Sequence, residues 1–451
     1  MNHRILTSAS LLVLAGASSA QWSFDERPDL LVLDLLEPNN AMPHLLYFEP
    51  GCQNVPAGDY VREADLAVGD LDQNGFADVV AAFKRVGYCA GGFPAMLLLG
   101  DGAKLYQSTR TKAPDFLNIP MDARDVTIAD ATGDGYPEVF FAATNGEPQR
   151  MFLNLGAGAG GQWLGLQHVP AGWFTTDLPM SPNDYGDELL SCAVSLADVD
   201  RDGDADLYYG NYKNANYSRL LINDGTGNFV DETIARVTAG NSGAFTVGLL
   251  LDMNQNDTWG SPEIVQIQPL SAPELLVNRN KGNFTASQAV TTLAGEPYSY
   301  GAGDLNGDGR IDLYVGGDDQ DGATLNLSTK PNGKINISQV PVTGRRVMEN
   351  FTLAGNIKLA DVDNDGDDDV FVSSQDVFSF TGCGTTLTIL ETTQPGGSTA
   401  LVDPFDLQPT PDFYIPGAWD VGLLDVDSDG CLDFVSVGCD GFQVWIGDNC
   451  P

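Results

Sequence analysis

The chain has 451 residues, of which 43% are hydrophobic and 9% aromatic, with 51 glycines and 25 prolines. This composition predicts a folded protein with a buried core and excludes a wholly disordered chain. The 62 acidic residues outnumber the 22 basic ones and give a formal charge of −40. Such a charge argues against a nucleic-acid-binding protein and against a surface that binds anionic lipids.

Residues 1–20 are typical of a secretory signal peptide, because Arg4 precedes the apolar stretch Leu11–Leu14 and the segment ends in the small residues Ser18–Ala20. We expect cleavage before Gln21 and export of the rest of the chain, to the extracellular space or the periplasm. A buried N-terminal helix is the alternative. No later segment approaches the roughly 20 apolar residues of a membrane span, so we expect no membrane insertion.

Seven cysteines follow this segment. In an oxidising compartment some of them should pair, and the odd number leaves at least one without a partner in the same chain. Cys439 and Cys450 flank a short apolar run and could close the last hairpin.

A nine-residue phrase rich in Asp and Gly recurs along the chain, as in Asp198-Val-Asp-Arg-Asp-Gly-Asp-Ala-Asp206. The seven copies begin at Asp70, Asp130, Asp198, Asp252, Asp304, Asp361 and Asp425. Their starts are separated by 60, 68, 54, 52, 57 and 64 residues. Copies at such near-regular spacing indicate an internal structural repeat.

Short runs of β-branched and aromatic residues surround each phrase and predict strands. Runs that precede the phrase include 193–197 and 421–424. Runs that follow it are 79–83, 139–142, 207–209, 313–315, 370–372 and 434–437. A further apolar run, often ending in Asn or Gly, occurs at 96–99, 151–153, 220–222, 275–277 and 444–446. Each repeat therefore holds about four strands, and no long amphipathic helix is expected.

A unit of about 60 residues with four strands, repeated in series, is typical of a β-propeller. We predict an all-β fold in which residues 21–451 form a single domain, a seven-bladed β-propeller of four-stranded blades. A linear solenoid is the alternative, but it usually has a shorter period and capping repeats. The seventh repeat ends after its third strand, and the segment His44–Phe48 precedes the first repeat. We therefore expect an N-terminal strand to complete the last blade and close the ring.

The phrase has the pattern of a loop that binds a hard cation. Side-chain oxygens recur at positions 1, 3, 5 and 9, Gly at position 6 allows a sharp reversal, and position 7 offers its backbone carbonyl. This oxygen-rich, acidic set suits Ca²⁺ better than Mg²⁺, and His and Cys are absent from the side-chain ligand positions. An ordinary Asp/Gly turn is the alternative for any one copy. We expect five or six structural Ca²⁺ sites.

The predicted ligands are Asp70, Asp72, Asn74, Phe76, Asp78, Asp130, Thr132, Asp134, Tyr136, Glu138, Asp198, Asp200, Asp202, Asp204, Asp206, Asp304, Asn306, Asp308, Arg310, Asp312, Asp361, Asp363, Asp365, Asp367, Asp369, Asp425, Asp427, Asp429, Cys431 and Asp433. The copy at Asp252 keeps Asn254 and Asn256 but lacks Gly at position 6 and carries an insertion before Glu263. We do not expect that copy to bind an ion.

The phrase, its flanking strands and the continuation Asn223-Asp-Gly-Thr-Gly-Asn-Phe229 resemble FG-GAP/VCBS repeats, as found in the heads of integrin α-subunits. The resemblance extends over residues 45–451. It implies a seven-bladed propeller with Ca²⁺ in the loop between the first and second strands of a blade. The family includes adhesion heads, lectins and polysaccharide lyases, so several functions are compatible with it. The Phe-Gly…Gly-Ala-Pro signature is altered here, as at Tyr300-Gly301 and Gly316-Gly317.

We predict a secreted, non-catalytic binding or adhesion module, a monomer whose partner is an extracellular glycan or protein. The longest gap between phrases holds Trp163, Trp173 and Tyr185, which could stack on sugars or pack between blades. The alternative function is a propeller enzyme, with a polysaccharide lyase as the first reaction class to consider. His168 and Arg150, with Tyr185, could supply its base, charge neutraliser and acid, but their spacing does not require this, and we assign no catalytic residue.

Overall fold

The computed structural model describes the greater part of the chain. The described residues are 23–33, 61–85, 93–144, 148–169, 191–211, 218–238, 247–253, 261–267, 274–279, 281–289, 299–316, 322–326, 337–340, 342–343, 353–362, 364–375, 387–393, 400–402, 418–438 and 441–448. Within these ranges strands dominate, as predicted for an all-β fold. The helices found there are short: η1 (Pro28–Leu30), α1 (Thr109–Lys112), α2 (Pro114–Asn118) and α3 (Thr233–Arg236). In the same ranges no helix has the length and apolarity needed to cross a membrane.

The described strands form seven sheets, which we number in the order of the repeats. Sheet 1 contains β2 (Leu31–Val32), β3 (Val61–Gly69), β4 (Asp78–Arg85), β5 (Met96–Gly100) and β6 (Leu105–Gln107). Sheet 2 contains β7 (Ala123–Ala129), β8 (Glu138–Ala143), β9 (Arg150–Asn154) and β10 (Leu166–His168). Sheet 3 contains β11 (Ser191–Ala197), β12 (Asp206–Asn211), β13 (Arg219–Asn223) and β14 (Phe229–Asp231). Sheet 4 contains β15 (Val247–Leu251), β16 (Glu263–Ile267), β17 (Glu274–Asn278) and β18 (Phe284–Ala289).

The other three sheets follow the same plan. Sheet 5 contains β19 (Ser299–Gly303), β20 (Asp312–Gly316), β21 (Gly322–Asn326) and β22 (Ile337–Val340). Sheet 6 contains β23 (Val342–Thr343), β24 (Leu353–Ala360), β25 (Asp369–Gln375), β26 (Thr388–Thr393) and β27 (Ala400–Val402). Sheet 7 contains β28 (Ala418–Leu424), β29 (Asp433–Gly438), β30 (Gly441–Asp448) and β1 (Ser23–Glu26).

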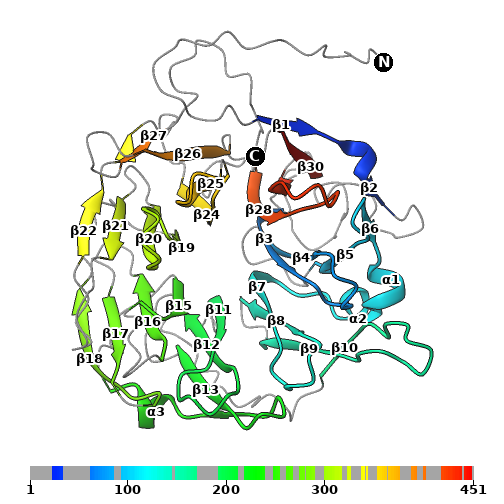
Figure 1. Ribbon diagram of the computed structural model, residues 1–451. Helices are drawn as coiled ribbons and strands as arrows, with labels where there is room; N and C mark the ends of the chain where they lie inside the picture. The colour runs from blue at the N-terminus through cyan, green and yellow to red at the C-terminus, as the bar shows by residue number, and fades with distance from the viewer. Residues whose placement is uncertain are drawn as a thin grey trace, which may run out of the picture.

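The sheets are arranged as a ring (Figure 1). In each sheet one strand lies near the centre (β3, β7, β11, β15, β19, β24 or β28); we call it the first strand of the sheet, and the following strands step outward in antiparallel register. The short strands β2 and β23 add a parallel fifth strand to the outer edge of sheets 1 and 6. This is a propeller-like architecture.

The two ends of the chain meet in sheet 7. Strand β1 pairs with β30 in antiparallel register, with Ser23 opposite Asp448 and Glu26 opposite Trp445. The predicted completion of the last sheet by an N-terminal strand is therefore found, but the strand that completes it is β1. The segment His44–Phe48 lies outside the described residues.

The core lies between neighbouring sheets, and the middle strands are buried on both faces. In β4, Val79 and Ala81 pack with Val435 of sheet 7, whereas Val80 and Ala82 pack with side chains of sheet 2. Two buried faces explain the continuous apolar runs that predicted these strands. Full burial of a Val or Leu side chain contributes about 1.5–3 kcal/mol, so these layers supply most of the cohesion between sheets.

Candidate metal centres and the axial channel

Each Asp/Gly phrase joins the first strand of a sheet to the second, as the resemblance implied. We call the phrases loops 1 to 7 in chain order and number the residues of each loop from its first Asp; in loop 4, which carries an insertion, Pro262 and Glu263 are the counterparts of positions 8 and 9. Position 9 is the first residue of the second strand, as in Asp78 of β4 and Asp206 of β12.

In loops 1, 2, 3, 5, 6 and 7 the backbone turns through two left-handed residues. Glycine stands at position 6 with a positive φ, as in Gly75 (φ 90°) and Gly203 (φ 102°), which agrees with the predicted reversal. Position 4 is also left-handed, and there a residue with a side chain is often accepted, as in Gln73 (φ 57°) and Arg201 (φ 61°). The sequence analysis did not anticipate this second turn.

Position 1 fixes the shape of the loop. Its carboxylate accepts the N–H of the position 6 glycine, at 2.9 Å from Gly75 to Asp70 and 3.1 Å from Gly203 to Asp198. The same bond occurs in the loops that begin at Asp130, Asp304, Asp361 and Asp425. One oxygen of each of these side chains is therefore directed to the backbone before any cation is considered.

Position 9 is buried and clamps the loop. The carboxylate of Asp78 accepts the N–H of Leu71 at 2.8 Å and that of Gly100 at 2.9 Å. Equivalent bonds from the position 2 N–H reach Glu138, Asp206, Glu263, Asp312, Asp369 and Asp433. Burial raises the pKa of Asp78, Glu138 and Asp206 to about 7 and that of Asp433 to about 6.

Three loops bring three predicted carboxylates together. In each of them one oxygen per side chain lies within 4.8 Å of the others. The three groups are Asp70, Asp72 and Asp78; Asp198, Asp200 and Asp206; and Asp425, Asp427 and Asp433. They are the acids at positions 1, 3 and 9 of loops 1, 3 and 7.

Several oxygens at these positions are buried and accept no hydrogen bond. In loop 7 they are Oδ1 of Asp425 and Oδ1 of Asp427, and in loop 3 Oδ1 of Asp200. The hydroxyl of Thr132 at position 3 of loop 2 is in the same state. A buried oxygen without a partner costs about 1–3 kcal/mol, and a bound cation would remove that cost. The donor set is made of hard oxygens, so it fits Ca²⁺.

Other predicted ligands have protein partners or lie outside the described part. Asp200 pairs with Arg236 of α3 at 3.1 Å, and Asp308 pairs with Arg310 at 2.7 Å. The position 7 residue of loop 7, Cys431, is in a disulfide bond. The predicted ligand Asp363 lies outside the described residues, as do Asn254 and Asn256 of loop 4. Cys439 and Cys450, which could close the last hairpin, lie outside them as well.

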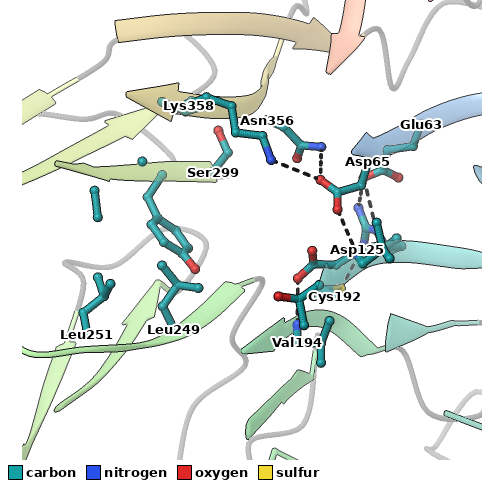
Figure 2. Close-up of a pocket in the computed structure, with 17 residues that line it drawn as sticks. Glu63, Asp65, Asp125, Cys192, Val194, Leu249, Leu251, Ser299, Asn356 and Lys358 are labelled. Carbon is teal, nitrogen blue, oxygen red and sulfur yellow. Dashed lines mark hydrogen bonds and ion pairs between the residues drawn. The ribbon is translucent and has the colours of Figure 1, made fainter. Parts of the chain in front are cut away.

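The centre of the ring encloses a cavity of about 340 Å³ (Figure 2). Glu63, Asp65 and Asp125 lie on one side of it, Leu249 and Leu251 lie on another, and Lys358 extends its amine toward Asp65. The inner strands β3, β7, β11, β15, β19 and β24 supply its walls.

Three axial aspartates connect the inner strands. Asp420 of β28 accepts the N–H of Leu66 in β3 at 2.7 Å, and Asp65 of β3 accepts that of Val126 in β7 at 2.8 Å. In turn, Asp125 of β7 accepts the N–H of Val194 in β11 at 2.7 Å. These bonds link four neighbouring sheets at their inner edges.

Lys358 of β24 is the cation of this group. Its Nζ lies 3.4 Å from Asp420 and 3.8 Å from Asp65. Burial would lower the pKa of Lys358, but these carboxylates outweigh it and raise that pKa. Burial raises the pKa of Asp420 to about 8, and burial together with Asp65 raises that of Asp125 well above its usual value.

A second ion cluster lies on the same wall. Glu63 pairs with Lys84 at 2.5 Å and with Arg124 at 2.9 Å. Burial alone would raise the pKa of Glu63, but the two cations lower it to about 2. Arg124 also donates to the sulfur of Cys192, a thiol that is not in a disulfide bond, at 3.0 Å.

The axial aspartates were missed in the sequence analysis, although a signal exists. Asp65, Asp125 and Asp420 each stand five residues before the first Asp of their loop. Because each one already accepts a backbone N–H across a sheet boundary, we assign them to holding the ring together.

Trp163 and His168, candidates for sugar binding and catalysis, pack against other side chains. Trp163 is 6% exposed and donates from Nε1 to Asn154 at 2.7 Å. The ring of His168 lies 5.4 Å from that of Phe152, and burial and Arg150 lower its pKa. Packing between sheets, the alternative given for Trp163, is therefore found. Trp173 and Tyr185 lie outside the described residues.

The comparison with known families concerns the segment that contains loop 5. Residues 260–315 match the family described as FG-GAP-like repeat. This segment is an FG-GAP-like repeat. It spans parts of sheets 4 and 5, so the predicted resemblance is confirmed there. No curated protein matches the chain in sequence.

One of three similar solved structures supports the propeller-like fold. The chain is similar to a lectin from Agrocybe aegerita described as recognising non-reducing terminal N-acetylglucosamine, with a TM-score of 0.51 and 17% identity over 85% of this chain and 93% of the lectin. It also matches the Photorhabdus luminescens Tc holotoxin pore (TM-score 0.39, 15% identity, 83% of this chain, 16% of that one). A rhamnogalacturonan lyase from Bacillus licheniformis has a TM-score of 0.38 and 11% identity, over 86% of this chain and 71% of that one. At these identities the likeness to the lectin concerns the fold, and we base no argument on the other two.

Proposed function

We propose that this protein is a secreted FG-GAP-type propeller of seven blades, stabilised by Ca²⁺, that acts as a non-catalytic binding or adhesion module. The observation that carries the proposal is the convergence of the acids at positions 1, 3 and 9 in loops 1, 3 and 7. The buried oxygens of Asp425 and Asp427, which accept no hydrogen bond, support a cation as the missing partner.

The position of the loops favours a structural role for the ion. Each loop joins the two inner strands of a sheet, so a bound Ca²⁺ would hold both strands and offset the repulsion among the acids. Free ion at 100 times Kd would add about 2.7 kcal/mol per site. We assign the strongest sites to loops 1, 3 and 7 and further sites to loops 2, 5 and 6, which gives six ions, the upper end of the five or six expected.

A glycan is the first ligand class to test, and a protein is the second. The fold shared with a lectin supports this order. The titratable groups of the axial cavity support a module without catalysis, because Asp65, Asp125 and Glu63 are committed to backbone or ion-pair contacts within the described part of the chain. We propose that the module acts as a monomer after export.

The test combines binding and stability. The chain without residues 1–20 is applied to a broad glycan array that includes glycans ending in N-acetylglucosamine, in millimolar Ca²⁺ and again in EGTA. Thermal unfolding is followed in both buffers, with Mg²⁺ as the control ion. We expect a higher Tm in Ca²⁺ than in EGTA or Mg²⁺, and glycan binding that is lost when the fold is lost.

The two parts of the proposal can fail separately. An unfolding curve that EGTA leaves unchanged would contradict the calcium sites. A calcium-dependent curve without binding to any glycan would contradict the glycan as ligand and leave proteins as the class to screen.

A further inference from the structure

Buried asparagines end the third strand of three successive sheets. They are Asn154 of β9, Asn223 of β13 and Asn278 of β17, each 2–3% exposed. The sequence analysis noted that this run often ends in Asn or Gly without giving the residue a role. In the structure these side chains lie between consecutive loops.

Each asparagine amide bridges two loops. Nδ2 of Asn154 donates to the carbonyl of Leu71 in loop 1 at 2.8 Å and to that of Pro137 in loop 2 at 3.0 Å. Nδ2 of Asn223 donates to Ala131 in loop 2 at 2.7 Å and to Ala205 in loop 3 at 3.0 Å.

The third asparagine repeats the pattern between loops 3 and 4. Nδ2 of Asn278 donates to Val199 at 2.8 Å and to Pro262 at 3.2 Å. At three successive sheet boundaries an asparagine therefore bridges position 2 of one loop and position 8, or its counterpart in loop 4, of the next loop.

The accepting carbonyls stand next to the proposed ligands. Leu71 is position 2 of loop 1, between the ligands Asp70 and Asp72. Pro137 is position 8 of loop 2, directly before Glu138 and after the position 7 carbonyl. A shift of either carbonyl moves the ligands beside it, because they share its peptide units.

The bridges form a continuous network with the position 9 clamps. The N–H of Leu71 donates to Asp78 within loop 1, while its carbonyl accepts from Asn154. The backbone N–H of Asn223 donates to Asp206, which is position 9 of loop 3, at 2.9 Å. Position 9 of one loop is thus connected through position 2 and an asparagine to position 9 of the next.

Sheets 1 and 7 lack this bridge. Gly100 is the last residue of β5 and Gly447 the last but one of β30, and a Cβ at these positions would lie only 2.3 Å from the carbonyl oxygen of Ala77 and 2.4 Å from that of Leu432. Those carbonyls belong to position 8 of loops 1 and 7, so no side chain fits there. Loop 7 therefore has no asparagine bridge to loop 1, although it has the same acids.

We propose that Asn154 and Asn223 are positioning residues that couple cation binding in neighbouring loops, whereas Asn278 makes the same bridge to loop 4, where we expect no ion. An ion in loop 1 holds the carbonyl of position 2 in place. That carbonyl holds the Asn154 amide, and the amide in turn holds the carbonyl of position 8 in loop 2. Loop 2 therefore loses less conformational entropy when it binds its own ion. Loops 1 to 3 bind cooperatively, and loop 7 binds independently. The inference rests on the proposed Ca²⁺ binding.

The test reads loop 2 alone. Tb³⁺ replaces Ca²⁺, and its luminescence is excited through Tyr136 at position 7 of loop 2, with Tyr136→Phe identifying the signal from that loop. Loop 1 is disabled by Asp72→Asn, or loop 7 by the matched change Asp427→Asn. All variants carry Gln73→Gly, because the Gln73 side chain also donates to Gly135 of loop 2.

We expect Asp72→Asn to weaken Tb³⁺ binding at loop 2 by about fivefold or more, the lower range of measured couplings, and Asp427→Asn to leave it unchanged. Adding Asn154→Asp removes the donor, keeps an acceptor for Trp163, and should abolish the effect of Asp72→Asn. Equal effects of Asp72→Asn and Asp427→Asn would overturn the coupling, even if the Asn154 variant does not fold. Absence of any Tb³⁺ or Ca²⁺ binding by the parent would overturn the calcium proposal itself.

Discussion

In loop 1, the carboxylate of Asp78 accepts the backbone N–H of Leu71 at 2.8 Å, seven residues earlier in the chain. The contact occurs at the same spacing in loops 2, 3, 5, 6 and 7, and in loop 4 its counterpart is Glu263, which accepts the N–H of Met253, ten residues earlier, at 3.1 Å. Loop 4 lacks the glycine at position 6 and has Asn in place of acid at positions 3 and 5, but it has kept this buried carboxylate. Position 9 is therefore required by the fold, whereas position 3 is free to serve a cation.

This division predicts different results for two variants of loop 1. Asp78→Ala leaves the N–H groups of Leu71 and Gly100 buried without a partner, which costs about 2–5 kcal/mol with or without Ca²⁺. Asp72→Ala should lower stability only in Ca²⁺, because Asp72 contributes to the proposed site and not to the clamp. Urea unfolding of both variants in Ca²⁺ and in EGTA measures this. Equal losses in EGTA would show that the two positions do not differ in role.

The raised pKa values at position 9 predict an unusual pH dependence in the absence of ions. In the folded protein Asp78, Glu138 and Asp206 have a pKa of about 7, above the usual values near 4 in an unfolded chain. Their contribution to stability is complete below about pH 4 and is lost as the pH rises through 7. In EGTA the free energy of unfolding should fall between about pH 5 and pH 8. In saturating Ca²⁺, which holds these carboxylates ionised, this fall should shrink.

Denaturant titrations at several pH values test this directly. The matched control is Glu138→Gln, which removes one of the titrating groups and should flatten the profile in EGTA. A profile in EGTA that rises over this range would contradict the assignment.

The ion cluster on the axial wall predicts a large effect from a single neutral substitution. Arg124→Met leaves Glu63 buried with Lys84 as its remaining cation, and removal of one partner of a buried pair costs about 3–5 kcal/mol. The loss should be greatest at neutral pH and smaller in acid, where Glu63 can take up a proton. The folded-state pKa of Glu63, now about 2, should rise in the variant. Lys281→Met, at an exposed lysine, is the control and should have little effect. A small, pH-independent loss for Arg124→Met would show that Glu63 does not depend on it.

The sequence predicted the strands and loops because their causes are local. Val79–Phe83 is apolar on both faces and directly follows an Asp/Gly loop, so its register is set by residues next to it. The left-handed turn at Gly75 likewise needs no knowledge of distant segments.

The interactions between sheets could not be predicted in this way. Asp65 finds its partner Val126 61 residues away, and Asn154 finds Leu71 83 residues away. Only the ring geometry brings these residues together. The recurrence of Asp five residues before a loop was visible, but a polar residue in a strand is equally typical of a solvent-exposed face.

Closure of the ring by β1 predicts that substitutions at two neighbouring residues of this strand differ in their effect on stability. Phe24 is 7% exposed, and its ring lies 4.8 Å from that of Phe434 and 6.4 Å from that of Phe371, so it connects β1 to sheets 6 and 7. Phe24→Ala should cost about 3–5 kcal/mol, the range for a buried Phe. Asp25→Ala is the matched control, because the neighbouring side chain points to solvent and should contribute little. Thermal unfolding and limited proteolysis should show early release of the N-terminus in Phe24→Ala. Loss of β1 would expose the edge of β30 and must lower stability if β1 completes the last sheet. If both variants unfold like the parent protein, β1 therefore does not close the ring in solution.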